Sequence, residues 1–256
     1  MPQLRALPAL RDNYIWMLAD AASGCALVVD PGEARPVLSA LAQSGCRLTA
    51  ILLTHHHPDH IGGTAGLLAR FPEAVVFAPH DERIGLVTRR VGEGDRIALA
   101  APSAQFEVIE VPGHTRTHIA YHGEGLLFCG DTLFSLGCGR LFEGTPAQML
   151  ASLDRLAALP GNTQVCCGHE YTLANAAFAL TVEPDNAVLR TREETARALR
   201  RSGLPTLPSL IDGERAANPF LRVDAIAAAR IPGAAEGADR VARFAALRLA
   251  KDHFPG

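Results

Sequence analysis

The chain has 256 residues, of which 48% are hydrophobic and 20% are charged, and its formal net charge is −3. A chain of this length and balance can bury a full core, as one large domain or as one domain with a small appendage. The slightly acidic balance gives no case for binding nucleic acid or a membrane surface, and no apolar run approaches the roughly 20 residues that span a bilayer. We therefore expect an ordinary soluble globular protein.

The cysteines and the start of the chain indicate the compartment. Residues 1–16 lack a cationic stretch followed by an apolar core, so we expect no secretory signal. The six cysteines form no paired framework and no CxxC pair, which speaks against a disulfide scaffold and against a zinc ribbon. Several lie in apolar strand patterns, where a reduced, buried thiol is expected. The cytoplasm is the expected location.

Hydrophobic patterning predicts mainly strands in the first part of the chain. The expected elements are strands at 14–18 and 25–30, a helix that ends near Gly45, a strand at 48–53, a helix from Thr64, and strands at 74–78, 105–111, 118–122 and 126–129. A strand–helix–strand unit implies a mixed sheet with helices on its outer faces. The many early strands favour two packed sheets over one doubly wound sheet.

Helices dominate the later part of the chain. We expect a helix from Thr145 as N-cap to about 159, a last strand at 163–167, a helix capped by Asp185 or Asn186 that reaches Arg201, and a terminal helix with Val241, Ala245 and Leu249 on one stripe. The change of character predicts a domain boundary near residue 170. The predicted domains are 1–170 and 171–256.

The most informative stretch is Thr54-His55-His56-His57-Pro58-Asp59-His60, which directly follows the strand at 48–53. Neutral imidazole and carboxylate are the ligands that zinc and similar divalent ions prefer. At a strand exit His55, His57 and Asp59 can share one side, and a turn at Pro58 lets His60 swing back. A merely solvated polar loop is the alternative. Four candidate ligands at the end of a buried strand favour a cation.

Three more candidate ligands each follow a glycine at the end of a predicted strand. They are His114, Asp131 and His169. Taken singly, each has an ordinary structural explanation as a turn, a cap or a satisfied imidazole. Together with the first stretch they make seven potential ligands, which is too many for one zinc but suits two ions that share a carboxylate. The set is His55, His57, Asp59, His60, His114, Asp131 and His169.

The remaining histidines have other expected places. His56 lies between two ligands and should point away from them. His80, His122 and His253 are expected at the surface. His118 begins a strand beside His114 and is expected to support a ligand from behind.

The order of these motifs resembles a known family. THxHxDH, GHT, GDT and GHE, in this order, resemble the metallo-β-lactamase superfamily, which has an αββα sandwich fold. Further matches cover almost the whole chain and resemble the glyoxalase II (hydroxyacylglutathione hydrolase) family: DNYIW at 12–16, VDPG at 29–32, CGDTLF at 129–134, GCGRLFEGT at 137–145, CGHEYT at 167–172 and NPFLR at 218–222. The resemblance implies an α/β metallo-β-lactamase-like sandwich with a C-terminal helical domain that binds glutathione.

The resemblance also implies a ligand assignment for two divalent ions, with zinc expected and iron or manganese as alternatives. One ion would be held by His55, His57 and His114, the other by Asp59, His60 and His169, with Asp131 and a hydroxide bridging them. Asp59, Asp131 and His60 are the implied catalytic group.

Four positions match residues that bind substrate in that family: Arg140, Tyr171, Arg248 and Lys251. Arg248 and Lys251 are three residues apart, so on a helix they share a face and can clamp a carboxylate together. Lys251 is the only lysine in the sequence, which favours a specific chemical role over a solvated surface one.

The chain departs from the family pattern at three positions of its motifs. Arg140 stands where lysine is usual. Phe142 stands where tyrosine is frequent, which puts one hydroxyl contact to the glutathione backbone in doubt. Thr117 replaces a usual glycine before His118, which affects local backbone geometry. None of these changes removes a metal ligand.

The activity implied by the resemblance is hydrolysis of S-(2-hydroxyacyl)glutathione, chiefly S-D-lactoylglutathione, to glutathione and D-lactate in methylglyoxal degradation, with the metal-bridging hydroxide as nucleophile. We expect a monomer that binds neither nucleic acid nor membrane. One alternative is another superfamily hydrolase or a persulfide dioxygenase with one iron, against which Arg248 and Lys251 argue. The other is a non-catalytic metal-binding or nucleic-acid-binding module, against which the acidic balance and the complete ligand set argue.

Overall fold

The computed structural model of the chain describes residues 2–255. They form two compact units. The first unit takes the chain up to Glu110 together with Thr117–Gly130, and the second takes Val111–Arg116 and the chain from Asp131 onward. The units are therefore not continuous in sequence. The short segment Val111–Arg116 belongs to the second unit, whereas the strands on either side of it belong to the first.

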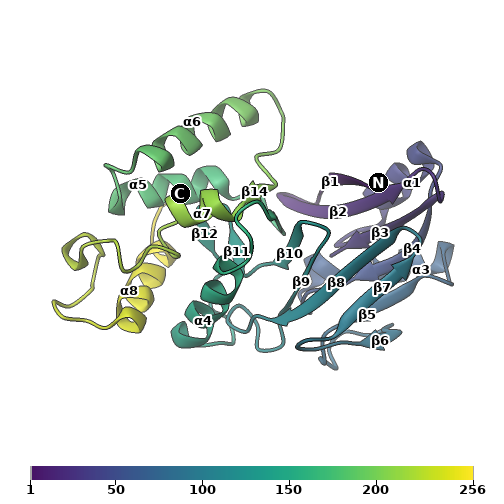
Figure 1. The fold of residues 1–256 in the computed structure, drawn as a ribbon, viewed down its shortest axis with the longest axis horizontal. Coiled ribbons are helices and arrows are strands. Elements are labelled where there is room, and N and C mark those ends of the chain that lie inside the picture. Colours follow the sequence, from purple (N-terminus) through teal and green to yellow (C-terminus); the bar gives the residue numbers. More distant parts are fainter. Residues whose placement is uncertain (1, 256) are drawn as a thin grey trace. The chain divides into compact units, whose positions relative to one another are not determined.

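A mixed sheet builds one layer of the first unit (Figure 1). Its strands lie in sequence order: β1 Gln3–Ala9, β2 Asn13–Asp20, β3 Cys25–Val29, β4 Arg47–Leu52, β5 Val75–Ala78 and β6 Arg89–Arg90. The pairs β1–β2 and β2–β3 are antiparallel, whereas β3 to β6 run parallel. Parallel neighbours end at the same edge of a sheet, so the residues that leave β3 and β4 start from adjacent places. The N–H of Asp30, just after β3, donates to the carbonyl of Leu52 on β4 at 2.9 Å.

Three helices follow strands of this sheet: α1 Ala34–Ser44, α2 Pro58–Ile61 and α3 Thr64–Arg70. The predicted end of α1 is confirmed, because Gly45 takes the left-handed conformation (φ 66°) that glycine adopts without steric cost. Apolar residues of the helices and strands pack into one core, including the buried Ile15, Val37, Ile51 and Leu67.

A second, antiparallel sheet completes the first unit. The order of its strands in this unit is β10 Leu126–Gly130, β9 Ile119–Gly123, β8 Ser103–Glu110 and β7 Arg96–Ala100. Two hydroxyls connect it to the first sheet: Tyr121 on β9 donates to the carbonyl of Leu53 at 2.8 Å, and Thr49 on β4 donates to the carbonyl of Ala101 at 2.7 Å. Two packed sheets, as the sequence predicts, are therefore confirmed.

The second unit is mostly helical. It contains the hairpin β11 Leu133–Phe134 and β12 Gly137–Cys138, α4 Pro146–Ala157, β13 Gln164–Cys167, α5 Thr172–Val182, α6 Ala187–Arg201, β14 Ser209–Leu210, α7 Ile211–Ala217, a 3-10 turn at Ala228–Arg230, and α8 Arg240–Asp252. Two predicted caps are confirmed. Thr145 forms a capping box with Gln148, and the side chain of Asn186 accepts from Val188 and Leu189 at the start of α6.

Several elements differ from the expectation. The strands β1 and β7 were not predicted, and β14 pairs with β13, so 163–167 is not the last strand. The predicted stripe of α8 is also wrong: Val241 and Leu249 are 38% and 58% exposed, whereas Phe244 and Leu247 are buried. A helix with apolar residues on two sides does not reveal from sequence which side will be buried.

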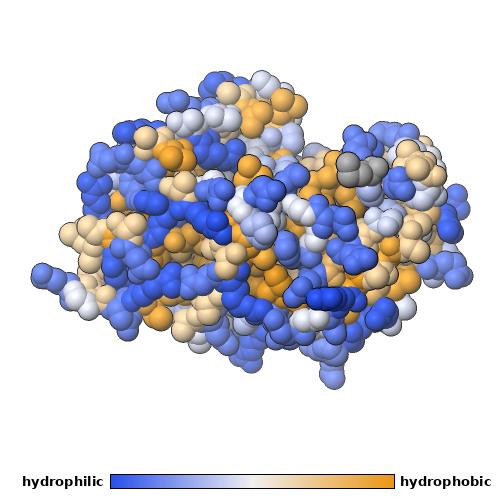
Figure 2. Space-filling view, viewed as in Figure 1, coloured by the Kyte–Doolittle hydropathy of each residue, from blue (hydrophilic) through white to orange (hydrophobic). Residues whose placement is uncertain are grey.

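The surface and the cysteines are those of an ordinary globular chain. Hydrophilic side chains cover most of the face shown in Figure 2, with hydrophobic ones scattered among them. All six cysteines are buried, as expected, and none forms a disulfide among the described residues. Among residues 2–255, none of the helices has the length and apolar character needed to cross a membrane.

Candidate active site

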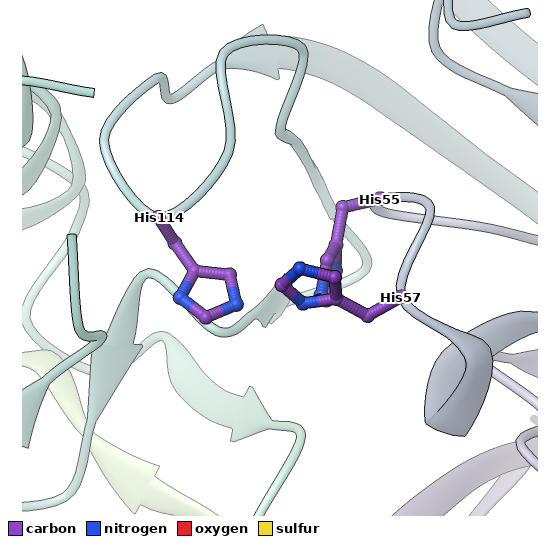
Figure 3. Close-up of side chains that lie close together, drawn as sticks. All are labelled: His55, His57 and His114. Carbon is purple, nitrogen blue, oxygen red and sulfur yellow. The ribbon is translucent and has the colours of Figure 1, made fainter. Parts of the chain in front are cut away.

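In the first unit, the candidate ligands gather where β4 ends. His55 is fully buried, and its Nε2 lies 3.1 Å from Nδ1 of His57. Their ring centroids are 4.7 Å apart at 80°, and Figure 3 shows the two rings against each other beside the loop. On the other side of its ring, Nδ1 of His55 lies 3.0 Å from the hydroxyl of Thr54. The loop that follows β4 therefore brings two imidazole nitrogens, one from His55 and one from His57, next to each other.

Asp30 organises this loop from behind. Its carboxylate accepts from the N–H of Thr54 at 2.8 Å and from the hydroxyl of Thr54 at 2.7 Å, and it lies 3.0 Å from Nδ1 of His60. The hydroxyl proton of Thr54 is thus used, so its oxygen accepts from Nδ1–H of His55. Both His55 and His60 then carry their proton on Nδ1 and keep an Nε2 lone pair, which is the state a metal ligand requires.

Asp59 and His60 lie together on the short helix α2, which begins at Pro58, where the sequence predicts a turn. Oδ2 of Asp59 is 3.4 Å from Nε2 of His60, and it accepts from the side-chain amide of Asn13 at 2.9 Å. The backbone of Gly32 passes so close that an added Cβ would meet the carbonyl oxygen of Asp59 at 1.9 Å. Only glycine allows this approach, which seats α2 against the exit of β3.

The other histidines of the first unit take supporting or outside places. Nδ1 of His56 faces Asp81 at 3.5 Å, so this ring turns away from its neighbours, as expected. His118 is fully buried and stacks on His55, with ring centroids 4.5 Å apart at 19°. His80 is exposed, whereas His122 is only half-buried rather than on the open surface.

In the second unit, Asp131 lies between two imidazoles. Its Oδ2 is 3.4 Å from Nε2 of His114 and 3.3 Å from Nε2 of His169, and all three side chains are buried. Nδ1 of His114 donates to the carbonyl of Arg140 at 2.8 Å, so Nε2 keeps its lone pair. Figure 3 also draws His114 on its loop. One carboxylate oxygen shared between two imidazoles is the arrangement expected of a ligand common to two cations.

Aromatic rings surround these ligands in the second unit. Tyr171 stacks on His169 at 4.8 Å and 5°, and Phe134 meets Tyr171 edge to face at 5.3 Å. Phe142 packs against His114 at 5.2 Å while 61% of it is exposed. The rings limit the orientations of both imidazoles and give the site apolar walls.

A cavity of about 410 Å³ opens within the second unit beside these groups. Its walls combine candidate metal ligands with all four predicted substrate-binding side chains. The lining residues are His114, Asp131, Phe134, Cys138, Arg140, Phe142, Tyr171, Ala174, Asn175, Arg248, Lys251, Asp252 and Phe254.

The cationic wall of the cavity is held in place by specific bonds. Arg248 donates to the carbonyl of Cys138 at 2.7 Å, and Lys251 donates to the carbonyl of Ala174 at 3.1 Å. Asp252 accepts from both Arg140 and Arg248 at 3.1 Å. Partial burial, followed by the nearby charge of Arg248, lowers the pKa of Lys251. The wall is thus cationic, and Asp252 is the carboxylate that pairs with its two arginines.

Three polar residues of the site were not identified from sequence: Asn13, Asp30 and Asp252. For Asp30 a signal existed, because Asp30-Pro31-Gly32 closes a strand next to the histidine motif. Asp252 is four residues after Arg248 on the same helix, a spacing that favours an ion pair. Asn13 gave no signal, because its contact with Asp59 joins residues that are far apart in the chain.

The donor sets of the two units fit a borderline divalent metal. They consist of imidazole nitrogens and carboxylate oxygens. At His55, His60 and His114, Nδ1 bonds to another group of the chain, so Nε2 is left to bind a metal. In the first unit alone, ligand atoms of Asp30, His55 and His60 lie within 4.8 Å of one another.

Comparison with known proteins agrees with this chemistry. The family model of the metallo-β-lactamase superfamily matches residues 10–169, and that of the hydroxyacylglutathione hydrolase C-terminus matches residues 170–254. A hydroxyacylglutathione hydrolase of Xanthomonas axonopodis pv. citri (strain 306) is 56% identical over 255 residues, covering 98% of this chain and 99% of the relative. The chain belongs to the hydroxyacylglutathione hydrolase family. The expected family and the expected fold class are both confirmed.

Solved structures share the fold of this hydroxyacylglutathione hydrolase family member. The B3 metallo-β-lactamase BLEG-1 superposes with a TM-score of 0.64 at 22% identity, covering 86% of this chain and 99% of that one. The protein TTHA1623, solved in a di-iron-bound form, has a TM-score of 0.53 at 29% identity and covers 65% of this chain and 91% of its own. The fold and the buried histidine and aspartate groups support binding of divalent metal.

Proposed function

We propose that the protein hydrolyses the thioester of S-(2-hydroxyacyl)glutathione, with S-D-lactoylglutathione as its main substrate, and releases glutathione and D-lactate in methylglyoxal degradation. Family membership, with high identity over nearly the full length of a hydroxyacylglutathione hydrolase, supports a thioester hydrolase. The proposed substrate and the proposed roles of individual residues are argued from the arrangement of side chains in the site.

One observation carries the proposal: a single cavity of the second unit brings His114 and Asp131 together with Arg140, Tyr171, Arg248 and Lys251. Groups suited to a metal thus share walls with cationic groups suited to a peptide carboxylate. A glutathione thioester needs both, because its reacting carbonyl and its carboxylates lie at different places in one molecule. The cavity volume of about 410 Å³ is in the range of small-molecule sites.

We assign the ligands as two groups that share Asp131. His55, His57 and His114 would hold one divalent ion, and Asp59, His60 and His169 the other, with zinc as the proposed metal. The di-iron form of TTHA1623 is a precedent for two metals in this fold. When bound, two such ions lower the pKa of water and stabilise charge on the reacting carbonyl oxygen.

The chain's own residues bind and orient the substrate. Arg248 and Lys251 line the cavity from α8 and would clamp a substrate carboxylate, and Tyr171 and Phe134, beside the candidate ligands, would flank the thioester end. We propose residues 1–170 as the catalytic domain and 171–256 as the helical substrate-binding domain. The glutathione thiolate is a good leaving group, so the chemistry needs no protein nucleophile.

Two further properties belong to the proposal. The free thiols favour a cytoplasmic location, because such thiols persist in a reducing compartment. A monomer is proposed, since each chain carries its own ligands and its own cationic wall.

The test is hydrolysis of S-D-lactoylglutathione by the purified protein, with metal analysis on the same sample. We expect equal amounts of free thiol and D-lactate, activity that disappears on chelation and returns with zinc, and about two metals per chain. His114→Gln should lose the activity, whereas His80→Gln, at an exposed histidine outside both ligand groups, should keep it. Full metal loading without thioester cleavage would refute the proposed substrate and leave the metal assignment standing.

A further inference from the structure

A buried carboxylate of the first unit, Asp81, lies behind the histidine motif and has no part in the proposed reaction. Only 7% of this residue is exposed. It accepts from Arg83 through the backbone N–H at 3.0 Å, Nε at 2.8 Å and Nη2 at 2.7 Å. The hydroxyl of Thr117 donates to it at 2.6 Å, and Nδ1 of His56 approaches it at 3.5 Å. A buried charge is costly unless it is paired and hydrogen-bonded, and the partners of Asp81 meet both conditions.

The partners of Asp81 come from three separate segments. His56 is in the loop that leaves β4, Arg83 follows β5, and Thr117 precedes β9. All three segments belong to the first unit. One side chain thus fixes the metal-ligand loop to two neighbouring strand ends.

The position of His56 in its loop makes this contact informative. In an extended segment, alternate side chains point to opposite sides. His55 and His57 place their ring nitrogens 3.1 Å apart on one side, and His56 between them turns to Asp81 on the other. Holding the middle residue therefore limits rotation of the backbone that carries both flanking ligands.

A second route leads from Asp81 to the same ligands through Thr117. The next residue, His118, stacks on the ring of His55 with centroids 4.5 Å apart. The hydroxyl bond from Thr117 to Asp81 is 2.6 Å long. It fixes the backbone just before the stacked ring.

We propose that Asp81 and Thr117 are positioning residues that hold His55 and His57 in the geometry required to bind metal. The inference rests on the proposed metal role of His55 and His57. The Arg83 guanidinium holds the pKa of Asp81 well below its usual range, so the carboxylate is charged at neutral pH and accepts the bonds from Arg83 and Thr117. Residues that orient metal ligands typically contribute about 10- to 100-fold to metal affinity.

Metal affinity, measured by competition with a chromogenic zinc chelator, tests the proposal. We expect Asp81→Asn and Thr117→Val to weaken zinc binding by about 10- to 100-fold, and Thr117→Ser, which keeps the hydroxyl, to restore it. At saturating zinc, kcat and KM should stay near the wild-type values, because neither side chain touches the substrate.

The matched control is Thr49→Val. Thr49 is a half-buried threonine of the same unit whose hydroxyl also bonds backbone carbonyls, of Ala26 at 3.1 Å and Ala101 at 2.7 Å, but it makes no contact with Asp81. This variant should lose thermal stability while keeping its zinc affinity. If Asp81→Asn does not fold, the comparison of Thr117→Val with Thr117→Ser and Thr49→Val decides.

Three results would overturn the proposal. One is wild-type zinc affinity in Thr117→Val and in folded Asp81→Asn. Another is an equal loss of affinity in Thr49→Val, which would reveal general destabilisation. The third is a wild-type protein that binds no zinc, which would also overturn the proposed function, whereas the first two leave that function intact.

Discussion

Arg248, which we propose to bind substrate, is held by several contacts within the chain. It is 7% exposed, although arginine is normally a surface residue, and it bonds both the carbonyl of Cys138 and the carboxylate of Asp252. Its guanidinium lies over the ring of Phe220 at 5.1 Å. These contacts fix the guanidinium before any substrate arrives, which lowers the entropic cost of binding.

Replacing Arg248 by alanine is therefore expected to raise KM more than it lowers kcat. A hydrogen bond to a charged group contributes about 1.5–3 kcal/mol, which corresponds to roughly a 10- to 100-fold rise in KM for S-D-lactoylglutathione. Steady-state kinetics on metal-loaded protein measure both constants. Arg201→Ala, at an exposed arginine of α6 that does not line the cavity, serves as the matched control and should behave as wild type. A loss of kcat with KM unchanged would contradict the binding role.

At the scale of elements, α7 and the residue after it hold the hairpin β11–β12 in place. Glu214 is fully buried and accepts from the N–H of Leu136 at 2.7 Å. Asn218 donates to the carbonyls of Phe134 at 3.0 Å and Gly137 at 2.9 Å. Since Phe134 and Cys138 of this hairpin line the cavity, the two polar side chains fix one wall of the binding site.

The buried Glu214 predicts a specific pH dependence of stability. Burial raises its pKa in the folded state above the usual value of 4.5, so the folded chain binds more protons than the unfolded one just above that pH. Stability from this group is therefore fully present below pH 4.5 and is lost as the pH rises through the folded-state pKa.

Glu214→Gln removes this titration and keeps an oxygen that can accept from Leu136. The difference in Tm between the variant and the wild type should shift in favour of the variant as the pH rises from 4.5 toward neutrality. Thermal unfolding at a series of pH values, with equal metal loading, provides the comparison. A difference that stays constant, or that moves toward the wild type, would contradict the assignment.

At the scale of the whole molecule, each unit carries part of the proposed ligand set, and all of its members except His57 and Asp59 are buried. The first unit supplies His55, His57, Asp59 and His60, and the second supplies His114, Asp131 and His169. Buried carboxylates and clustered imidazoles are unfavourable without a cation, so metal binding and folding should be coupled.

Removal of metal should therefore lower the thermal stability. A ligand present at 100 times its Kd stabilises the folded state by about 2.7 kcal/mol. For a chain of this size that free energy corresponds to a drop in Tm of roughly 5–11 °C on chelation, reversed by added zinc. Thermal unfolding with and without chelator, with metal content measured in parallel, tests this. An unchanged Tm in a sample shown to have lost its metal would contradict the coupling.

The sequence by itself determined the features that depend on local pattern. Features of this kind depend only on residues that are neighbours in the chain. They are the polar cluster after 48–53, the glycine before each of His114, Asp131 and His169, and the caps at Thr145 and Asn186. Strand and helix periodicities gave most of the elements and the packing of two sheets. The order of the ligand motifs gave the family.

Only the tertiary structure decided the features that depend on which distant residues meet. It buried Phe244 rather than Val241 on α8, paired β14 with β13, and placed Asn13 on Asp59 and Asp81 on Thr117. Each of these contacts depends on side-chain packing and on burying polar groups only where partners exist. Such requirements are satisfied across the fold rather than along the chain, so no local pattern in the sequence could reveal them.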